Sequence, residues 1–295
     1  MKKGLWYSVA AYGMWGLLPL YWKVFQDIGA WEILSHRIIW SVVFVLLLVT
    51  VTKRWKALTQ AVPDAKSKRS VIIASLLISL NWLIYIWAVN NNHMVEASLG
   101  YYINPLMNVF LGVFLLQERL SKLQGSAIAL AALGVLILTI SYGQFPWVSL
   151  SLATSFALYG FTKKKANLDT IVGLSLETLI VLPFALIYLV LFAQGGEAPQ
   201  LLSGWRWLLL SVAGVATALP LLFFAEGVKR LPLSIMGFVQ YLSPTITLFL
   251  GVLLYHESFS TIEFLSFGMI WSALVLYMIQ VTRNSQRSMP SPKVK

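Results

Sequence analysis

Long apolar segments alternate with short polar connections along this chain of 295 residues. A helix needs ~20 mainly apolar residues to cross the ~30 Å hydrocarbon core of a bilayer. The pattern predicts an all-α integral membrane protein with ten transmembrane helices, because ten segments reach or approach that length. They lie at residues 4–25, 31–51, 70–91, 95–117, 122–141, 146–162, 170–193, 205–226, 231–255 and 261–282.

The composition agrees with a bilayer as the solvent. The chain is 58% hydrophobic and 11% charged, whereas an ordinary soluble domain has about 25% charged residues. The apolar run from Leu5 to Phe25 follows two lysines, as in a signal peptide. We interpret it as the first span, because it is too long and lacks a small-residue cleavage site. The absence of Cys excludes disulfides and thiol chemistry.

The basic residues predict the orientation. Nineteen of the 22 Lys and Arg residues lie at the chain ends or in even-numbered connections, among them Lys163, Lys164 and Lys165. Cytoplasmic connections of membrane proteins are enriched in these residues. We therefore expect a multi-pass protein of the cell (plasma or inner) membrane with both termini in the cytoplasm. Topology and anionic lipid then explain the net charge of +11, so nucleic acid is not an expected partner.

One segment occurs twice. Residues 102–121 and 241–260 align without gaps at an offset of 139 residues, and nine of the twenty aligned positions are identical. The copies lie in the fourth and ninth spans, so they cross the membrane in opposite directions. The sequence therefore predicts two inverted five-helix repeats, residues 1–142 and 143–282, and a disordered basic cytoplasmic tail at 283–295. Many secondary transporters share this plan, with a binding site near the midplane between the repeats.

Each repeat carries the element Pro-x6-Gly-x5-Glu, at residues 105–118 and 244–257. Shorter motifs accompany it: Gly-Met-Trp-Gly-Leu-Leu-Pro at 13–19, Ser-His-Arg at 35–37, Asn-Trp-Leu-Ile-Tyr-Ile-Trp at 81–87 and Glu-Thr-Leu-Ile-Val-Leu-Pro at 177–183. With these features nearly the whole chain resembles the EamA-type members of the drug/metabolite transporter superfamily. Within them it resembles the RarD-type branch, which is named for a chloramphenicol-sensitivity phenotype. The resemblance implies two five-helix units and a transporter of small metabolites or drugs, often an exporter.

Polar and aromatic side chains inside the spans are the candidates for substrate contact. Polar groups avoid lipid, and an aromatic-lined pocket would suit an apolar or aromatic metabolite. The alternative is that these side chains join and pack the helices. The candidates are Tyr12, Trp15, Arg37, Asn81, Trp82, Tyr85, Tyr101, Asn104, Asn108, Glu177, Tyr241 and Thr245.

Arg37 and Glu177 are the charged members of this set. They lie at an offset of 140 residues, so they occupy near-equivalent positions in the two predicted repeats. Ionisable groups inside a membrane mark functional sites. An ion pair between the two would have to span ~10 Å of depth. Three interpretations stay open: such a pair, an Arg37 that snorkels to the interface, and a Glu177 that faces protein.

The duplicated segment supplies candidates for gating. Pro105 and Pro244 lie inside spans, where proline removes a backbone hydrogen bond and kinks the helix. We interpret them as hinges beside the cavity, with packing kinks as the alternative. Glu118 and Glu257 end the same helices, where a carboxylate opposes the helix dipole. We interpret both as latches that cap or pair with a neighbouring helix, with ion coupling as the alternative.

Signatures of catalysis are absent from the sequence, including phosphate-binding loops and His-Glu-x-x-His. The three histidines lack ligand spacing, so we expect no enzyme, no metal and no cofactor. We predict a secondary-active transporter of small metabolites, such as amino-acid-like solutes or amphenicol-type drugs. It would act as an exporter or exchanger by alternating access. A channel-like passive facilitator of the same solutes is the alternative, and the oligomeric state is left open.

Overall fold

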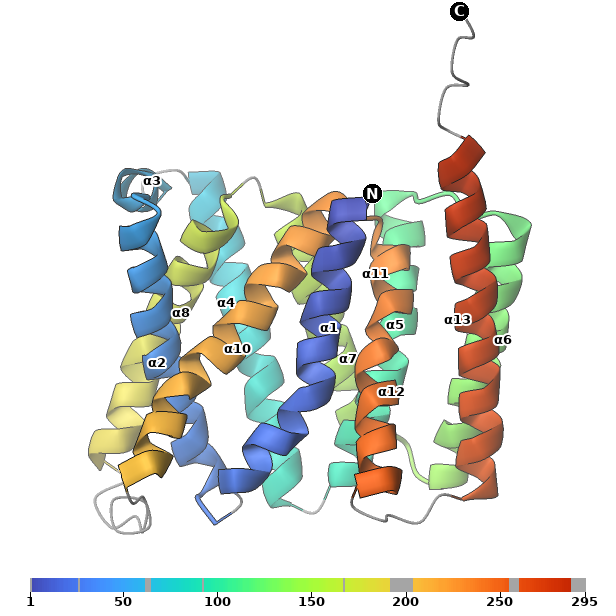
Figure 1. Ribbon diagram of the computed structural model, residues 1–295, viewed down its shortest axis with the longest axis horizontal. Coiled ribbons are helices and arrows are strands. Elements are labelled where there is room, and N and C mark those ends of the chain that lie inside the picture. Colours follow the sequence, from blue (N-terminus) through green and yellow to red (C-terminus); the bar gives the residue numbers. More distant parts are fainter. Residues whose placement is uncertain are drawn as a thin grey trace, which may run out of the picture.

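A computed structural model describes residues 2–25, 27–61, 65–91, 93–166, 168–191, 204–254 and 260–287. These residues form helices with short connections, and none of them lies in a β-strand (Figure 1). The prediction of an all-α protein is thus confirmed. The elements are α1 (Lys2–Trp22), η1 (Lys23–Phe25), α2 (Ala30–Val51), α3 (Trp55–Ala61), α4 (Ala65–Asn90), α5 (Met94–Leu116), α6 (Lys122–Tyr142), α7 (Trp147–Lys165), α8 (Thr170–Leu191), α10 (Gly204–Arg230), α11 (Leu233–Gln240), α12 (Leu242–Phe249), η3 (Leu250–Leu254) and α13 (Thr261–Arg287).

Eight segments in the described part of the chain are long and apolar enough to cross a membrane. They are α2, α4, α5, α6, α8, α10, the run from Leu233 to Leu254, and α13, and each coincides with a predicted span. The remaining predicted spans are α1 and α7, which do not reach the same apolarity. Both are flanked by other helices, α1 by α10 and α12 and α7 by α4 and α5. Helices covered by protein need fewer lipid-facing side chains. The count of ten spans stays a prediction.

The chain remains helical beyond the predicted end of the last span. The sequence predicts a disordered tail from residue 283, but α13 continues to Arg287. The first helix-breaking residue after this span is Pro290, so the local sequence contains nothing that stops the helix at 282. The rest of the predicted tail, residues 288–295, lies outside the described residues.

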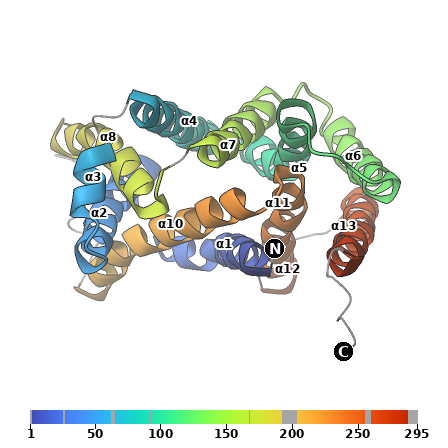
Figure 2. The same cartoon turned by 90° about the horizontal axis from the view of Figure 1, so that it is seen from above.

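Viewed end-on, the long helices stand in two rows (Figure 2). One row contains α8, α4, α7, α5 and α6, and the other contains α2, α10, α1, α11 with α12, and α13. Across the rows α2 packs on α8, α11 on α5 and α13 on α6. Within the rows, the contacts of α1 with α10 and α12 match those of α7 with α4 and α5. Each of these helices therefore has a counterpart five spans away along the chain, and the two counterparts pack against corresponding neighbours.

The two spans that carry the duplicated segment, with Pro105 and Pro244, differ from each other. α5 runs unbroken through Pro105, whereas the ninth predicted span consists of α11, α12 and the π-helix η3, with a turn at Tyr241. Pro244 has no N–H to donate to the carbonyl of Gln240, which weakens the helix at that turn. The backbone of Pro105 lies so close to Gly237 that a Cβ at that glycine would overlap the Pro105 carbonyl oxygen. A hinge role for both prolines stays a prediction.

Close backbone contact between α2 and α10 depends on Gly214. A Cβ at this position would overlap the backbone carbonyl of Trp40. Ser41 Oγ donates a hydrogen bond to the Gly214 carbonyl oxygen over 3.3 Å, which fixes the same crossing. Small residues allow membrane helices to approach in this way. The α2–α10 contact brings Arg37 of α2 against α10.

We predict that Gly214→Ala lowers the stability of the folded protein. The added methyl group forces α2 and α10 apart, and overpacking of this kind costs about 1–3 kcal/mol. Thermal unfolding in detergent measures the effect. Gly13→Ala is the matched control, because a Cβ at Gly13 meets no atom within 4 Å. Equal melting temperatures for the two variants would contradict the prediction.

Candidate functional site

A buried ion pair lies between α7 and α8. Lys163 Nζ donates to Glu177 Oε1 over 2.7 Å, and both side chains are about 5% exposed or less. The Tyr159 hydroxyl donates to Glu177 Oε2 over 3.0 Å, so both carboxylate oxygens of Glu177 have a donor. Tyr159 and Lys163 are four residues apart on α7, which places them on one face of that helix.

Glu177 does not pair with Arg37, the partner considered from the sequence. Glu177 faces protein, which is one of the interpretations left open, and its partner is Lys163. The charge pattern groups Lys163 with the cytoplasmic Lys164 and Lys165. The structure extends α7 to Lys165, and only Lys163 of the three is buried. The four-residue spacing from Tyr159 is the local signal, and it does not reveal which helix supplies the acid.

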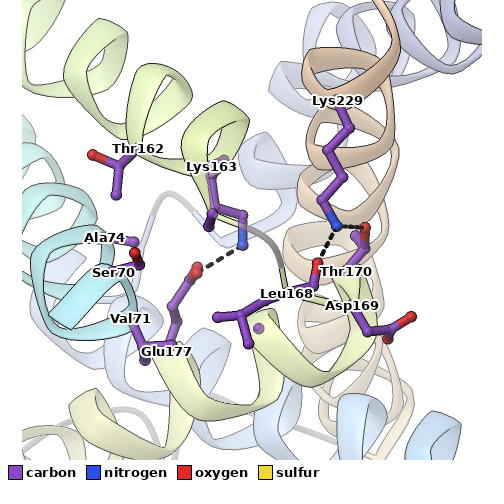
Figure 3. Close-up of a pocket in the computed structure, with 12 residues that line it drawn as sticks. Ser70, Val71, Ala74, Thr162, Lys163, Leu168, Asp169, Thr170, Glu177 and Lys229 are labelled. Carbon is purple, nitrogen blue, oxygen red and sulfur yellow. Dashed lines mark hydrogen bonds and ion pairs between the residues drawn. The ribbon is translucent and has the colours of Figure 1, made fainter. Parts of the chain in front are cut away.

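Two small cavities meet at Glu177. The first lies between α4, α7, α8 and α10, and Figure 3 shows the Lys163–Glu177 pair on its wall. Its lining also includes Ser70, Asp169 and Lys229. The second is lined by Glu177 and by Ser41, Trp82 and Tyr159, among others. Because Glu177 borders both cavities, the ion pair lies at the boundary between them.

Arg37 occupies a separate aromatic site. Its Nε donates to Thr217 Oγ1 of α10 over 3.0 Å. Its guanidinium carbon lies 4.6 Å from the ring centroid of Trp22 and 5.9 Å from that of Trp82. These contacts come from α1, α4 and α10, so the guanidinium is directed towards protein. These contacts differ from those of an arginine that snorkels to the interface, which is one of the interpretations left open.

Four of the sequence candidates come together around this guanidinium: Arg37, Trp82, Tyr85 and Tyr101. The rings of Tyr85 and Tyr101 meet edge to face with centroids 6.4 Å apart, and both hydroxyls lie within electrostatic range of Arg37. Trp82 also lines the second cavity. It thereby connects the Arg37 site to the Lys163–Glu177 pair.

Trp22 and Thr217 are members of the Arg37 site that the sequence does not single out. Trp22 precedes Lys23 near the end of the first span, which is the usual place of an interfacial anchor. Thr217 lies within an apolar run and has no polar neighbour to mark it. Their importance follows from the packing of α1 and α10 beside α2.

Three other candidates form a buried hydrogen-bonded chain. Asn108 Nδ2 donates to Gln240 Oε1 over 2.8 Å and to Asn104 Oδ1 over 3.1 Å. The Tyr12 hydroxyl donates to the same oxygen of Gln240 over 3.4 Å. Asn104 Nδ2 donates to the Ala153 carbonyl oxygen over 2.6 Å. These bonds join α1, α5, α7 and α11, which is the helix-joining alternative considered for these residues.

The remaining candidates lie away from both charged sites. Asn81 Nδ2 donates to the Leu152 carbonyl and to Ser155 Oγ of α7. Trp15 packs on Tyr12, Phe156 and Phe224. The Tyr241 hydroxyl donates to the Tyr102 carbonyl oxygen, and Thr245 Oγ1 accepts from Trp271 Nε1. All of these contacts except that of Trp15 with Tyr12, which lie together on α1, join one helix to another.

Glu118 caps the start of α11. Its Oε1 accepts from the Leu233 N–H over 2.7 Å, and its Oε2 accepts from the N–H and hydroxyl of Ser234 over 3.0 and 2.7 Å. A carboxylate at a helix N-terminus is favoured by the dipole and by the unpaired N–H groups. Gly112 is required because a Cβ there would lie 2.6 Å from Glu118 Oε2. Glu257, its counterpart in the second copy, lies outside the described residues.

A further buried carboxylate was not among the candidates. Glu96, at the start of α5, accepts from the Tyr142 hydroxyl over 2.9 Å and from the Val148 N–H over 3.2 Å. His93 Nδ1 lies 2.7 Å from its Oε1. Glu96 therefore caps α7 at the end of the bundle opposite Glu118. The position of Glu96 near a predicted span end resembles that of an ordinary surface acid, so the sequence gives no signal.

This membrane-embedded helical bundle, with buried charges and cavities between its two rows, is characteristic of a membrane transporter. The model of the EamA-like transporter family matches residues 2–140 and 146–279, and the chain belongs to that family, in its RarD branch. It is 49% identical over 279 residues to the uncharacterized transporter YojE of Bacillus subtilis (strain 168), covering 94% of this chain and 93% of YojE. It is 39% identical over 292 residues to the protein RarD of Escherichia coli (strain K12), covering 97% of each.

One further relative agrees with this placement, and one solved structure shares the fold. The protein RarD of Streptomyces exfoliatus is 41% identical over 288 residues, covering 97% of this chain and 91% of the relative. A solved crystal structure superposes with a TM-score of 0.71 over 95% of this chain and 98% of that one. Its sequence identity is 17%, so this second likeness concerns the fold alone.

We predict that the Lys163–Glu177 pair can be replaced as a unit but not broken. Glu177→Gln leaves a buried lysine without a counter-charge, which costs about 3–5 kcal/mol. The double variant Lys163→Met/Glu177→Leu removes both charges and recovers most of that loss. Unfolding free energies in detergent measure both effects. A double variant no more stable than Glu177→Gln would contradict the prediction.

Glu226→Gln is the control for this experiment. Glu226 pairs with Arg230 four residues along α10, where the side chains are 25% and 46% exposed, and it also accepts from the Thr170 hydroxyl, a bond that the amide oxygen of Gln can keep. Pairs of this kind contribute about 0–1 kcal/mol. The control variant should therefore unfold at nearly the same free energy as the wild-type protein.

Proposed function

We propose that this protein is a secondary-active transporter of small metabolites that works by alternating access, as an exporter or exchanger. The observation that carries the proposal is the buried Lys163–Glu177 pair at the boundary of two cavities. Burying a charged side chain inside a membrane protein costs several kcal/mol of desolvation free energy unless it is paired with an opposite charge. The pair would be broken in an open conformation and formed in a closed one. A transporter that works by alternating access needs both conformations.

The proposed architecture is ten transmembrane helices in two inverted five-helix repeats. The preserved packing pairs between the two rows of helices support this plan. The two matched segments, residues 2–140 and 146–279, have boundaries close to those of the predicted repeats.

We propose that the bundle is closed at the end that contains the start of α1 and the end of α13, which lie at the same end as the start of α11 in Figure 1. Glu118 joins the end of α5 to the start of α11 at this end. Lys163, in the last turn of α7, lies at the same end. We propose that this end faces the cytoplasm, because it carries most of the basic residues. The proposed cytoplasmic gate then combines the Glu118 latch with the Lys163–Glu177 pair.

The substrates are proposed to be amino-acid-like solutes or amphenicol-type drugs. One relative, 30% identical and covering 93% of each chain, is the chloramphenicol-sensitive protein RarD of Pseudomonas aeruginosa. The rings of Trp22 and Trp82 at the Arg37 site support this proposal, because ligand sites are lined mainly by apolar and aromatic side chains with a few placed polar groups.

We predict saturable counterflow in proteoliposomes that contain the purified protein. Radiolabelled chloramphenicol and radiolabelled amino acids are tested one at a time, with the unlabelled compound inside the vesicles. Exchange should saturate with external concentration and depend on the internal compound, because one site faces each side in turn. Flux that rises linearly with concentration would instead indicate a channel-like facilitator.

Counterflow measured in variants tests whether the proposed gate is needed for transport. Glu177→Gln should lose most of the counterflow, because the pair can no longer close, and Glu226→Gln should retain it. Only variants recovered as folded protein at wild-type yield enter the comparison. Wild-type counterflow in Glu177→Gln would show that the pair has no part in transport.

A further inference from the structure

The guanidinium of Arg37 has no counter-charge in the described part of the chain. None of the ion pairs formed by the described residues includes it. Of its donors, Nε is bonded to Thr217. The ionisable groups within its electrostatic range are Tyr85, Tyr101 and Tyr21, which are all neutral donors at physiological pH.

Arg37 is half-buried, so its unbonded N–H groups are not sealed from a ligand or solvent. A charged side chain inside the membrane normally pairs with an acid or reaches the interface, and the buried cation Lys163 has Glu177. Arg37 is instead held by the faces of Trp22 and Trp82. Cation–π contacts orient a guanidinium but do not supply acceptors for its N–H groups. An arginine presents five donors in a fixed fork, so most of this fork has no acceptor in the described residues.

We propose that Arg37 binds the carboxylate of a transported solute, with an aromatic or apolar body of the solute against the surrounding rings. The guanidinium fork matches a carboxylate in two parallel hydrogen bonds. Tyr85 and Tyr101 lie within electrostatic range of this guanidinium. The body of the solute would lie against the rings of Trp22 and Trp82. The ligand class is therefore a small organic carboxylate, and this subsite deepens the proposed function on which it rests.

The test measures binding of phenylacetate by calorimetry to the full-length protein in nanodiscs of zwitterionic lipid. 2-Phenylethanol is the neutral ligand of the same shape. The wild-type protein should bind phenylacetate at least ~10-fold more tightly than 2-phenylethanol, because a charged hydrogen-bonded pair contributes more than a neutral one. Equal affinity for the two compounds, or no binding of phenylacetate, would overturn the proposal.

Variants locate the carboxylate. Arg37→Gln should weaken phenylacetate binding at least ~10-fold, whereas Arg37→Lys should retain part of the affinity because it keeps the charge without the fork. Arg206→Gln is the matched control, since Arg206 is paired with Asp27 in another part of the structure. If Arg37→Gln does not fold, the test is the affinity of Arg37→Lys for phenylacetate, which should lie between that of the wild-type protein and no binding. Unchanged affinity in Arg37→Lys and Arg37→Gln would overturn the assignment.

Two further outcomes separate this subsite from the alternatives. Phosphatidylglycerol added to the nanodiscs should leave phenylacetate binding unchanged, and competition by this lipid would overturn the solute assignment in favour of a headgroup. The binding measurement needs no transport. Phenylacetate binding at Arg37 without any counterflow would therefore reject the proposed transport mechanism and leave the carboxylate subsite standing.

Discussion

The buried pair of Lys163 and Glu177 is the interaction on which the rest of the site depends. Removing two charges from water costs several kcal/mol per ion, and a pair recovers this only with good geometry and further hydrogen bonds. Here the 2.7 Å contact and the hydroxyl of Tyr159 supply both. The pair requires α7 and α8 to keep their register, and Glu177 borders both cavities. A change in the pair therefore has to alter the boundary between the cavities.

Arg37 and Glu177 occupy near-equivalent positions in the proposed repeats, but their surroundings differ. Beside Glu177, the last turn of α7 provides a lysine. Beside Arg37, the last turn of α1 provides Trp22. One charge is therefore satisfied within the protein, and the other has aromatic faces and no acid among the described residues. The two proposed repeats thus place unlike surroundings around near-equivalent charged positions.

Helix positions could be predicted from the sequence because hydropathy is a local property. The eight apolar spans and the helices at α1 and α7 all lie close to their predicted ranges. The Glu118 latch was also foreseeable, since a carboxylate that ends a helix needs a partner elsewhere. The partner of Glu177 could not be foreseen. A run of three lysines indicates topology, and only the packing of α7 on α8 shows that Lys163 is buried.

Labelling of a single cysteine tests the central claim most directly. The chain has no native Cys, and Ser41 lines the second cavity. The measurement is the rate at which a membrane-impermeant maleimide, added from the cytoplasmic side of oriented vesicles, alkylates Ser41→Cys. The account predicts slow labelling while the Lys163–Glu177 pair is intact and much faster labelling when Glu177→Gln is added. Equal rates with and without the intact pair would contradict it.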